Sequence, residues 1–350
     1  MAVYTTINDP SVYFQTALYT GNGTNSNAVT NDGNSDLQPD WVWIKARNNA
    51  YEHKLFDSSR GTTKLLVSNS TVAEATQSGL TAFNSDGFSL GGDGGSNDAS
   101  TNFAAWQWKA NGGTTASNSD GSITSTVQAN TTSGFSVVTY TGNGSSGAAI
   151  GHGLSTPDVV LIKSRSITGY WIYNSFIIGS TGGTPDAPRN LYLNDTSAGQ
   201  SDKVCRNISA STFEISSSSA ANTSGDTYVA YCFKNVQGYQ KTGLYTGNGS
   251  TDGAFVYTGF SPAWVLVKRT DSGNNWHMHD NKRVPYNSND KTLYANLNNA
   301  EATEDLDMLS NGFKLRESGG GYNASGGTYI YMAFAENPFV TSDGVPTTAR

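Results

Sequence analysis

Apolar and polar side chains alternate with a period of two in three segments of the chain. These segments are NFAAWQWK (102–109), TYVAYCFK (227–234) and TYIYMAFA (328–335). One set of alternate positions is apolar and mostly large, and its members are Ala104, Trp106 and Trp108, Val229, Tyr231 and Phe233, and Ile330, Met332 and Phe334. Successive side chains of a strand point to opposite faces. Each segment is therefore predicted to be a strand whose large face lies on a hydrophobic core.

A second type of segment is apolar without alternation. The runs are PDWVWIK (39–45), PDVVLIK (157–163) and PAWVLVK (262–268), each led by a proline. A continuous apolar run of this length is typical of a strand that is covered on both faces. Each run is predicted to be the central strand of a sheet.

The pentapeptide YTGNG also occurs three times, at 19–23, 140–144 and 245–249. The proline of the apolar run follows its tyrosine by 20, 17 and 17 residues. Glycine and asparagine accept positive φ, so the triplet Gly-Asn-Gly predicts a hairpin turn after a strand that ends at Tyr-Thr. A glycine loop that cradles phosphate needs a helix directly after the glycines, and the segments that follow start none.

The constant order of these anchors predicts three copies of one unit. Each copy offers about seven short strands in ~100 residues, which indicates an all-β fold of tandem antiparallel β-sandwich or jelly-roll domains. A segment rich in Gly, Ser, Thr and Asn reads as a flexible linker. The predicted organisation is an N-terminal arm (1–11), repeat 1 (12–111), the linker (112–133), repeat 2 (134–236), repeat 3 (237–340) and a C-terminal tail (341–350).

Composition and charge narrow the class of protein. The chain has 350 residues with 39 glycines, 14% charged residues and a formal net charge of −7. Because Lys and Arg do not cluster, we expect no binding to nucleic acid. No apolar run reaches the ~18 residues of a membrane span, and MAVYTTINDP lacks the features of an export signal, so we expect no membrane insertion. Cys205 and Cys232 are expected to be reduced and buried, with a pair across neighbouring strands as the alternative.

The first repeat carries YTTINDPSVYFQTALYTGNG, QPDWVWIK, FDSSRG, FNSDGF and WQWKA in full. With these motifs it resembles a repeat of tail-fibre-like or lectin-like proteins from tailed phages of aquatic bacteria. The resemblance covers residues 4–110 strongly, and it implies a concanavalin A-like or SPRY-like sandwich in a virion protein made in the host cytoplasm. In the later repeats FDSSRG is replaced by YNSFIIG (173–179) and HDNKRV (279–284). The motifs of this family are structural anchors and supply no catalytic residues.

The segment WHMHD (276–280) suggests a metal site, because His277 and His279 point to one face of a strand beside Asp280. Alignment of the repeats favours structural histidines instead. In this alignment His277 corresponds to Lys54 of repeat 1 and Trp171 of repeat 2. His279 corresponds to Phe56 and Tyr173. We therefore expect neither a metal nor a cofactor.

Signals for catalysis are weak. Glycoside hydrolysis needs two carboxylates across a cleft. The acidic residues Glu301, Glu304, Asp305 and Asp307 instead form a single run, which predicts a solvated helix or loop. GGDGGSND (91–98) is one copy of a glycine–aspartate turn, whereas calcium-binding repeats stack several, so a solvated loop is favoured there. We expect a protein that is not an enzyme.

Binding through loops is the remaining possibility, since sandwich ends present loops and sugars are held by aromatic faces with polar partners. The candidate ligand-binding residues at loop edges are Tyr51, Tyr170, Trp171 and Tyr322, for each of which ordinary packing is the alternative.

The sequence therefore predicts a non-enzymatic virion surface protein, associated with the tail and bound to host surface polysaccharide. Its partners are expected to be other virion proteins in a symmetric assembly. The alternative is a capsid decoration protein anchored by the N-terminal arm. A glycan-degrading enzyme is a weaker alternative.

Overall fold

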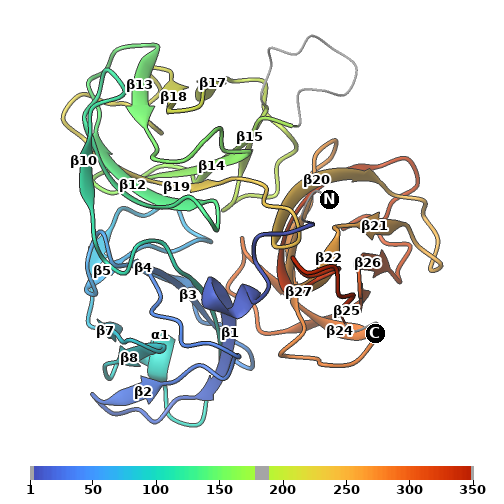
Figure 1. The fold of residues 1–350 in the computed structure, drawn as a ribbon. Coiled ribbons are helices and arrows are strands. Elements are labelled where there is room, and N and C mark those ends of the chain that lie inside the picture. Colours follow the sequence, from blue (N-terminus) through green and yellow to red (C-terminus); the bar gives the residue numbers. More distant parts are fainter. Residues whose placement is uncertain (1–3, 178–188, 348–350) are drawn as a thin grey trace.

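The computed structural model describes residues 4–177 and 189–347, whose regular structure is almost entirely strands (Figure 1). A 3₁₀ turn, η1 (Pro10–Val12), precedes repeat 1. Repeat 1 contains β1 (Phe14–Thr20), β2 (Asn27–Val29), β3 (Trp41–Ala46), β4 (Lys54–Asp57), β5 (Lys64–Leu65), β6 (Ala75–Thr76), β7 (Leu80–Phe83), β8 (Phe88–Leu90), the short helix α1 (Gly94–Asn97) and β9 (Asn102–Trp108).

The rest of the chain continues in the same way. The linker and repeat 2 contain β10 (Ala116–Asn118), β11 (Ser125–Asn130), β12 (Phe135–Thr141), β13 (Ala148–Gly151), β14 (Val159–Ser164), β15 (Ile172–Ser175), β16 (Arg189–Tyr192), β17 (Cys205–Ile208), β18 (Thr212–Ile215) and β19 (Thr227–Phe233). Repeat 3 contains β20 (Gln240–Thr246), β21 (Phe255–Tyr257), β22 (Phe260–Arg269), β23 (Trp276–Asp280), β24 (Asn289–Tyr294), β25 (Ala302–Leu309), β26 (Gly312–Leu315) and β27 (Thr328–Pro338).

Each repeat has the same four-stranded antiparallel centre. The strand orders are β1-β9-β3-β4, β12-β19-β14-β15 and β20-β27-β22-β23. The proline-led strands β3, β14 and β22 pair on both edges, and every residue of β3 and β14 is buried. The predicted all-β antiparallel fold and its central strands are confirmed.

The repeats differ in what covers this centre. Repeat 1 adds the three-stranded sheet β2-β8-β7, and repeat 2 adds β13-β18-β17. A separate hydrophobic cluster fills the space under each of these small sheets. Repeat 3 instead extends into one sheet of eight strands, whose terminal strands β20 and β21 are linked by a 3.0 Å hydrogen bond from Lys241 Nζ to the Tyr257 carbonyl oxygen. That sheet therefore nearly closes on itself.

Two segments predicted to be irregular contain strands. The expected linker, 112–133, contributes β10 and β11 to the seven-stranded sheet of repeat 2, so it belongs to that sheet. The acidic run, predicted to be a helix or loop, lies in β25 except for Glu301, and there Asp305 and Asp307 alternate with the buried apolar residues Leu306 and Met308. In both segments strand pairing overrides a polar composition.

The YTGNG segments do not form the predicted hairpins. In repeat 1 the strand after the motif, β2, belongs to the other sheet, so the loop carries the chain from one sheet to the other. A buried asparagine holds this loop. Asn97 Nδ2 donates to Thr24 O at 2.8 Å, and its Oδ1 accepts from Asn22 N at 3.0 Å. Asn222 and Asn323 make the equivalent contacts in repeats 2 and 3.

The tyrosine of each motif completes the same arrangement. Tyr19 donates a 2.7 Å hydrogen bond to the carbonyl oxygen of Ser96, next to the holding asparagine, and stacks on Phe103 at 5.1 Å. Tyr140 and Tyr245 make the matching bonds and stacks in their repeats. The motif recurs because each repeat uses the same loop.

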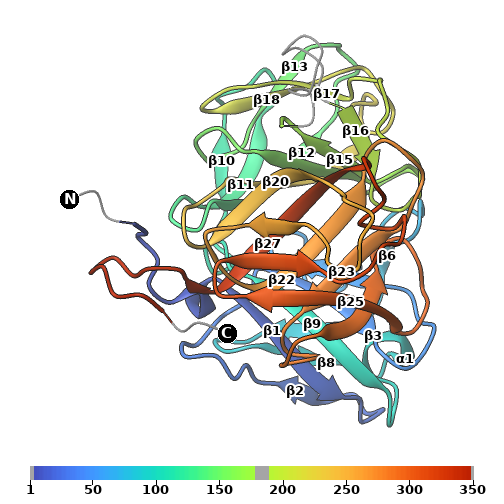
Figure 2. The ribbon, with the colours of Figure 1, turned by 90° about the vertical axis from the view of Figure 1, so that its right-hand side faces the viewer.

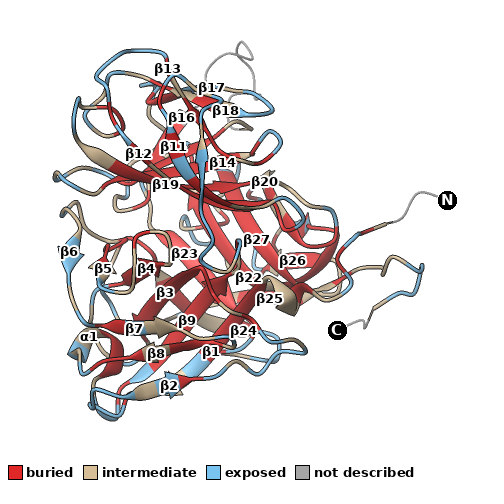
Figure 3. Ribbon diagram, turned by 60° about the vertical axis from the view of Figure 1, so that its left-hand side comes forward, coloured by how far each residue is buried: buried red, intermediate tan, exposed pale blue. Residues whose placement is uncertain are grey.

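The large faces of the closing strands pack against the other repeats, forming one shared core. Each pair of repeats contributes an aromatic contact, and the centroid distances are 4.4 Å for Trp41–Tyr231, 5.8 Å for Trp108–Trp264 and 5.9 Å for Phe233–Phe334. Figures 1 and 2 show the three repeats grouped around a common centre, with both termini on one side. The buried strands meet at that centre (Figure 3). These faces are therefore closed to ligands.

Candidate functional site

Each repeat binds the preceding one through a ring nitrogen at the start of its fourth strand. The three contacts, at 2.9, 2.8 and 2.9 Å, are His53 Nε2 to Tyr294 O, Trp171 Nε1 to Val67 O, and Trp276 Nε1 to Tyr192 O. They run from repeat 1 to 3, from 2 to 1 and from 3 to 2, which gives an approximate threefold cycle. Trp171 is fully buried in this cycle, so it offers no face to a ligand, contrary to the prediction.

The hydrogen bonds of His53 fix its protonation. Trp43 Nε1 can only donate, and it lies 2.8 Å from His53 Nδ1. His53 therefore carries its hydrogen on Nε2 and donates it to Tyr294. Burial, reinforced by the charge of Lys45, holds the pKa of His53 well below 6.5. The histidine is neutral at physiological pH.

The motif FDSSRG forms a buried ion pair between Asp57 and Arg60. Arg60 also reaches Glu74 at 3.0 Å, and Glu74 pairs with Arg165 of repeat 2 at 2.8 Å. Tyr231 of repeat 2 donates to Asp57 at 2.7 Å. The motif thus joins repeat 1 to repeat 2.

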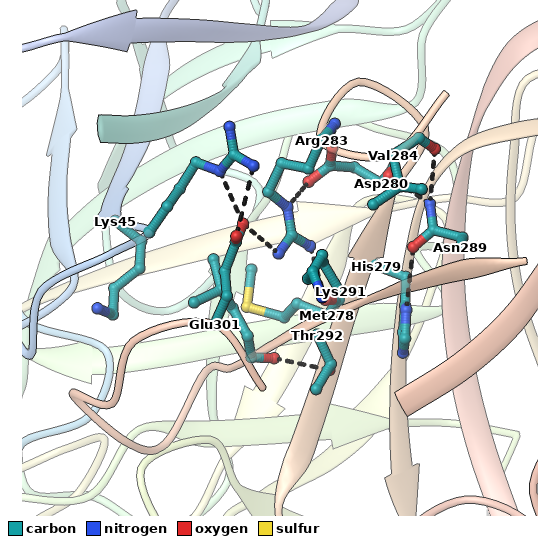
Figure 4. A network of polar contacts seen from close by, with 12 residues as sticks. Lys45, Met278, His279, Asp280, Arg283, Val284, Asn289, Lys291, Thr292 and Glu301 are labelled. Carbon is teal, nitrogen blue, oxygen red and sulfur yellow. Dashed lines mark hydrogen bonds and ion pairs between the residues drawn. The ribbon is translucent and has the colours of Figure 1, made fainter. Parts of the chain in front are cut away.

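HDNKRV repeats this network at the next seam. Asp280 pairs with Arg283 at 2.5 Å, and Arg283 contacts Glu301 at 3.2 Å (Figure 4). Glu301 then pairs with Arg47 of repeat 1 at 2.7 Å. Trp106 of repeat 1 donates to Asp280 at 3.1 Å, as Tyr231 does to Asp57. Asp57, Asp280 and Glu301 are thus engaged in structural ion pairs.

The third seam, between repeats 2 and 3, does not show this network in the part of the chain that the structure describes. Strand pairing places Ser175 where the other repeats have the aspartate. At the seam between repeats 1 and 2, the backbone N–H of Glu74 donates to the carbonyl oxygen of Arg165. The equivalent backbone hydrogen bond at the third seam runs from Gly199 to Thr270, at 2.9 Å. Neither Gly199 nor Thr270 carries a charge, so the seam has no ion pair at these positions.

Three buried lysines occupy equivalent ends of the central strands. Lys45, Lys163 and Lys268 each donate to two backbone carbonyl groups at 2.8–3.2 Å, and burial lowers the pKa of each to about 8. Lys163 reaches Thr71 in repeat 1, and Lys268 reaches Thr196 in repeat 2. The ammonium groups of Lys163 and Lys268 hold loops together across the seams, whereas both acceptors of Lys45 lie in repeat 1.

The histidines of WHMHD lie in a packed environment. His277 Nδ1 contacts Glu304 Oε2 at 2.6 Å, and the Tyr322 ring lies 5.1 Å from the imidazole. Among the described residues no group of three His, Cys, Asp or Glu is placed to hold a metal ion. Strand pairing also corrects the predicted alignment, because Ile172 and Asn174 occupy the places that were assigned to Trp171 and Tyr173.

GGDGGSND is also structural. The segment contains α1, and Asp93 forms a 2.5 Å ion pair with Lys54. Ser96 and Asn97 are fully buried, so the segment is not the solvated loop that was predicted.

Two of the predicted ligand-binding tyrosines are engaged inside their own repeats. Tyr51 is partly buried, and its hydroxyl donates to Asp98 at 3.0 Å. Tyr322 is 2% exposed and donates to the Asp305 carbonyl oxygen at 3.0 Å. Tyr322 therefore offers no free aromatic face, and the Tyr51 hydroxyl group is already bound to Asp98.

Tyr170 differs from the other three candidates because it is 43% exposed. Its ring stacks on Tyr192 with centroids 4.4 Å apart and planes 17° apart. The Tyr192 hydroxyl group donates to Asp202 at 3.2 Å, and burial together with this carboxylate raises the pKa of Tyr192 to about 12. The two tyrosines form an aromatic surface at the edge of repeat 2.

Asp202 connects this aromatic surface to a polar pocket of about 650 Å³. Arg206 and Asn207 of β17 also line it, with serines of the neighbouring loops. The pocket therefore offers positively charged, negatively charged and neutral hydrogen-bonding groups near the exposed ring of Tyr170. No local pattern points to Tyr192 and Asp202, because their proximity to Tyr170 depends on the strand pairing of β15 with β16.

Comparison with known proteins gives a family but no function. A family model described as a domain of unknown function, DUF7483, matches residues 9–338 and so spans all three repeats. The chain belongs to this family. Comparisons with curated proteins and with solved structures gave no match. Among the described residues no helix is long and apolar enough to cross a membrane.

Proposed function

We propose that the chain is a non-enzymatic virion surface protein of a tailed phage, associated with the tail, and that it binds host surface glycan. In this proposal the three repeats are variants of one antiparallel β-sandwich. The observation that carries it is the exposed Tyr170–Tyr192 stack beside the polar pocket at Asp202. An aromatic ring packs on the apolar face of a sugar, and polar side chains bind its hydroxyl groups.

The rest of the molecule suits a scaffold for such a surface. The shared core and the two buried ion networks fix the repeats relative to one another. Loops held on a rigid scaffold are where binding residues commonly lie. In a virion, the other partners would be structural proteins in a symmetric assembly.

The alternative, a capsid decoration protein anchored by its N-terminal arm, ranks second for a structural reason. Tyr4 donates to the Gly259 carbonyl oxygen at 2.7 Å, and Thr5 donates to the Gln237 carbonyl oxygen at 2.8 Å. This part of the arm is therefore bound within its own chain. A glycan-degrading enzyme ranks third, because Asp57 and Asp280 are used in ion pairs within their repeats and Glu301 in an ion pair with Arg47 of repeat 1.

Binding of host surface polysaccharide to the full chain tests the proposal. Calorimetric titration with purified polysaccharide should give measurable binding, and Tyr170→Ala should weaken it by about five- to tenfold through loss of ring stacking. Tyr286→Ala is the matched control, since Tyr286 is 80% exposed in repeat 3 and should not matter. Absence of binding, or equal effects of the two variants, would reject the glycan site.

A reducing-sugar assay on the same mixtures tests the claim that the protein is not an enzyme. We expect no increase in reducing ends over buffer. Release of oligosaccharide by the wild-type chain would overturn the non-enzymatic part of the proposal.

A further inference from the structure

A second pocket, of about 380 Å³, lies between the N-terminal arm and repeat 3. Tyr4 of the arm and Tyr257 of β21 supply aromatic rings, and Asn235, Gln237 and Gln240 supply amide groups. The pocket is separate from the Tyr170–Tyr192 surface of repeat 2. Its volume falls in the range of small-molecule sites, which usually combine aromatic walls with a few polar groups.

Gln240 breaks the pattern of the repeats at this pocket. Phe14, Phe135 and Gln240 are equivalent, since each pairs with the last aromatic residue of the closing strand. Two repeats thus place a phenylalanine in the shared core where repeat 3 has an amide. Gln240 is 2% exposed, and its buried Oε1 has no hydrogen-bond partner among the described residues.

An unpartnered buried carbonyl oxygen is unfavourable, so a ligand that donates a hydrogen bond to it would be favoured here. The neighbouring repeats show that an apolar side chain fits the same strand position. Gln240 Nε2 is used within the chain, where it donates to the Lys234 carbonyl oxygen, so Oε1 is the atom of this amide that is left without a partner, at a residue that lines a pocket.

Lys241 gives the pocket its charge. Among the described lining residues it is the only ionised side chain, and its ammonium group lies 5.1 Å from the centre of the Tyr257 ring. Its hydrogen bond goes to a neutral acceptor, the Tyr257 carbonyl oxygen, at 3.0 Å. A carboxylate entering the pocket would form a charge-assisted hydrogen bond with this ammonium group.

The aromatic side of the pocket is half open. Tyr257 is 48% exposed, and the Tyr4 hydroxyl group lies 3.4 Å from the Tyr257 hydroxyl group. Tyr4 is held by its bond to Gly259. Together the two tyrosines present phenol groups and ring faces next to the amides and the lysine.

We infer that this pocket binds a sugar residue that carries a carboxylate, such as a hexuronic acid. Lys241 binds the carboxylate, and Tyr257 packs on the sugar ring. Gln240 turns its Oε1, which is buried in the free chain, towards the pocket to accept a hydrogen bond from a ring hydroxyl group. The inference shares the glycan-binding premise of the proposed function but assigns a different site with a defined ligand charge.

The test titrates the full chain with a glucuronic acid-containing oligosaccharide and with the same oligosaccharide after reduction of its carboxyl groups. Ligand-observed NMR and calorimetry should detect the acidic form and show at least about tenfold weaker binding of the reduced form. Lys241→Gln should weaken binding of the acidic form by a similar factor. Gln240→Phe, which installs the residue of the other repeats, should weaken both forms.

Tyr286→Ala, at an exposed tyrosine outside both sites, is the control and should leave binding of the acidic oligosaccharide unchanged. The two sites are distinguished because the loss caused by Lys241→Gln should be equally large in the wild-type chain and in the Tyr170→Ala background. Equal binding of the two forms would overturn the inference, as would affinities unchanged by both Lys241→Gln and Gln240→Phe. A glutamate-rich peptide that binds where neither oligosaccharide does would assign the pocket to a protein partner and overturn it as well. Circular dichroism confirms that each variant is folded.

Discussion

The Tyr231 hydroxyl group of repeat 2 donates a 2.7 Å hydrogen bond to the Asp57 carboxylate of repeat 1. The same carboxylate pairs with Arg60 inside FDSSRG, so one acid joins the motif to the neighbouring repeat. Trp106 and Asp280 show the same relationship at the next seam. The motif therefore connects repeats, and repeat 2 has Ser175 at the position of the aspartate.

Replacement of Asp57 by Ala is expected to lower the free energy of unfolding by about 3–5 kcal/mol, because it leaves the buried guanidinium group of Arg60 without its closest partner. Asp252→Ala is the control, since that exposed carboxylate pairs with Lys314 at the surface and should contribute little. Urea denaturation of the full chain measures both. Similar small losses in the two variants would contradict a structural role for the motif.

A second expectation concerns the first glycine of YTGNG. A Cβ atom at Gly21 would collide with the backbone carbonyl of Asp98, so Gly21→Ala should destabilise the chain by about 1–3 kcal/mol. Gly94 lies in α1 with nothing within 4 Å of an added Cβ, so Gly94→Ala should be neutral or slightly stabilising. Thermal denaturation compares the two. Equal melting temperatures would show that the loop adapts to a side chain.

The sequence predicts the strands well but not the core that they share. Alternation in NFAAWQWK identifies a buried face, and Trp106 and Trp108 are indeed buried. A period of two does not say which surface covers that face. The cover comes from repeat 3, through contacts such as Trp108 with Trp264, and long-range packing of this kind leaves no local pattern.

The candidate site shows the same limit at neighbouring residues. Tyr170 and Trp171 are adjacent aromatic residues, yet Tyr170 is exposed and Trp171 is buried. Trp171 packs against repeat 1, where its ring nitrogen donates to the Val67 carbonyl oxygen. Alignment of the repeats does carry one usable signal. It places Gln240 at the position that Phe14 and Phe135 occupy in the other two repeats. A polar residue at a position that is otherwise apolar indicates that its surroundings differ from those in the other repeats.

Repeat 2 with its added strands, residues 112–236, is expected not to fold as a stable monomer. Separation from the other repeats would expose large apolar side chains of the shared core, including Leu161, Tyr231 and Phe233. Size-exclusion chromatography and NMR should show aggregation or poorly dispersed signals, whereas the full chain should unfold in one transition. A monomeric segment with a cooperative transition would contradict the shared core.

Acid should destabilise the chain below about pH 6.5. Burial holds the pKa of His53 well below 6.5 and lowers that of His279 to about 4. The unfolded chain therefore takes up protons first as the pH falls, and stability that is complete above pH 6.5 is lost towards the folded pKa values. Urea denaturation between pH 7.5 and pH 4.5 measures the slope. Stability that is constant over this range would contradict buried neutral histidines.

A double substitution tests whether His53 causes this loss of stability in acid. It replaces Trp43 by leucine and His53 by tryptophan, the residues found at these positions in the other repeats. Strand pairing and the ring contacts place Leu161 with Trp171 at the equivalent positions. The double variant Trp43→Leu/His53→Trp should fold, keep the bond to Tyr294 and lose stability less steeply in acid, because one buried imidazole is gone. His53→Trp alone should cost about 1–3 kcal/mol at neutral pH, since it overfills the core and leaves the Trp43 indole without its acceptor. An acid slope in the double variant equal to that of the wild-type chain would assign the pH dependence to other groups, with His279 the next to test.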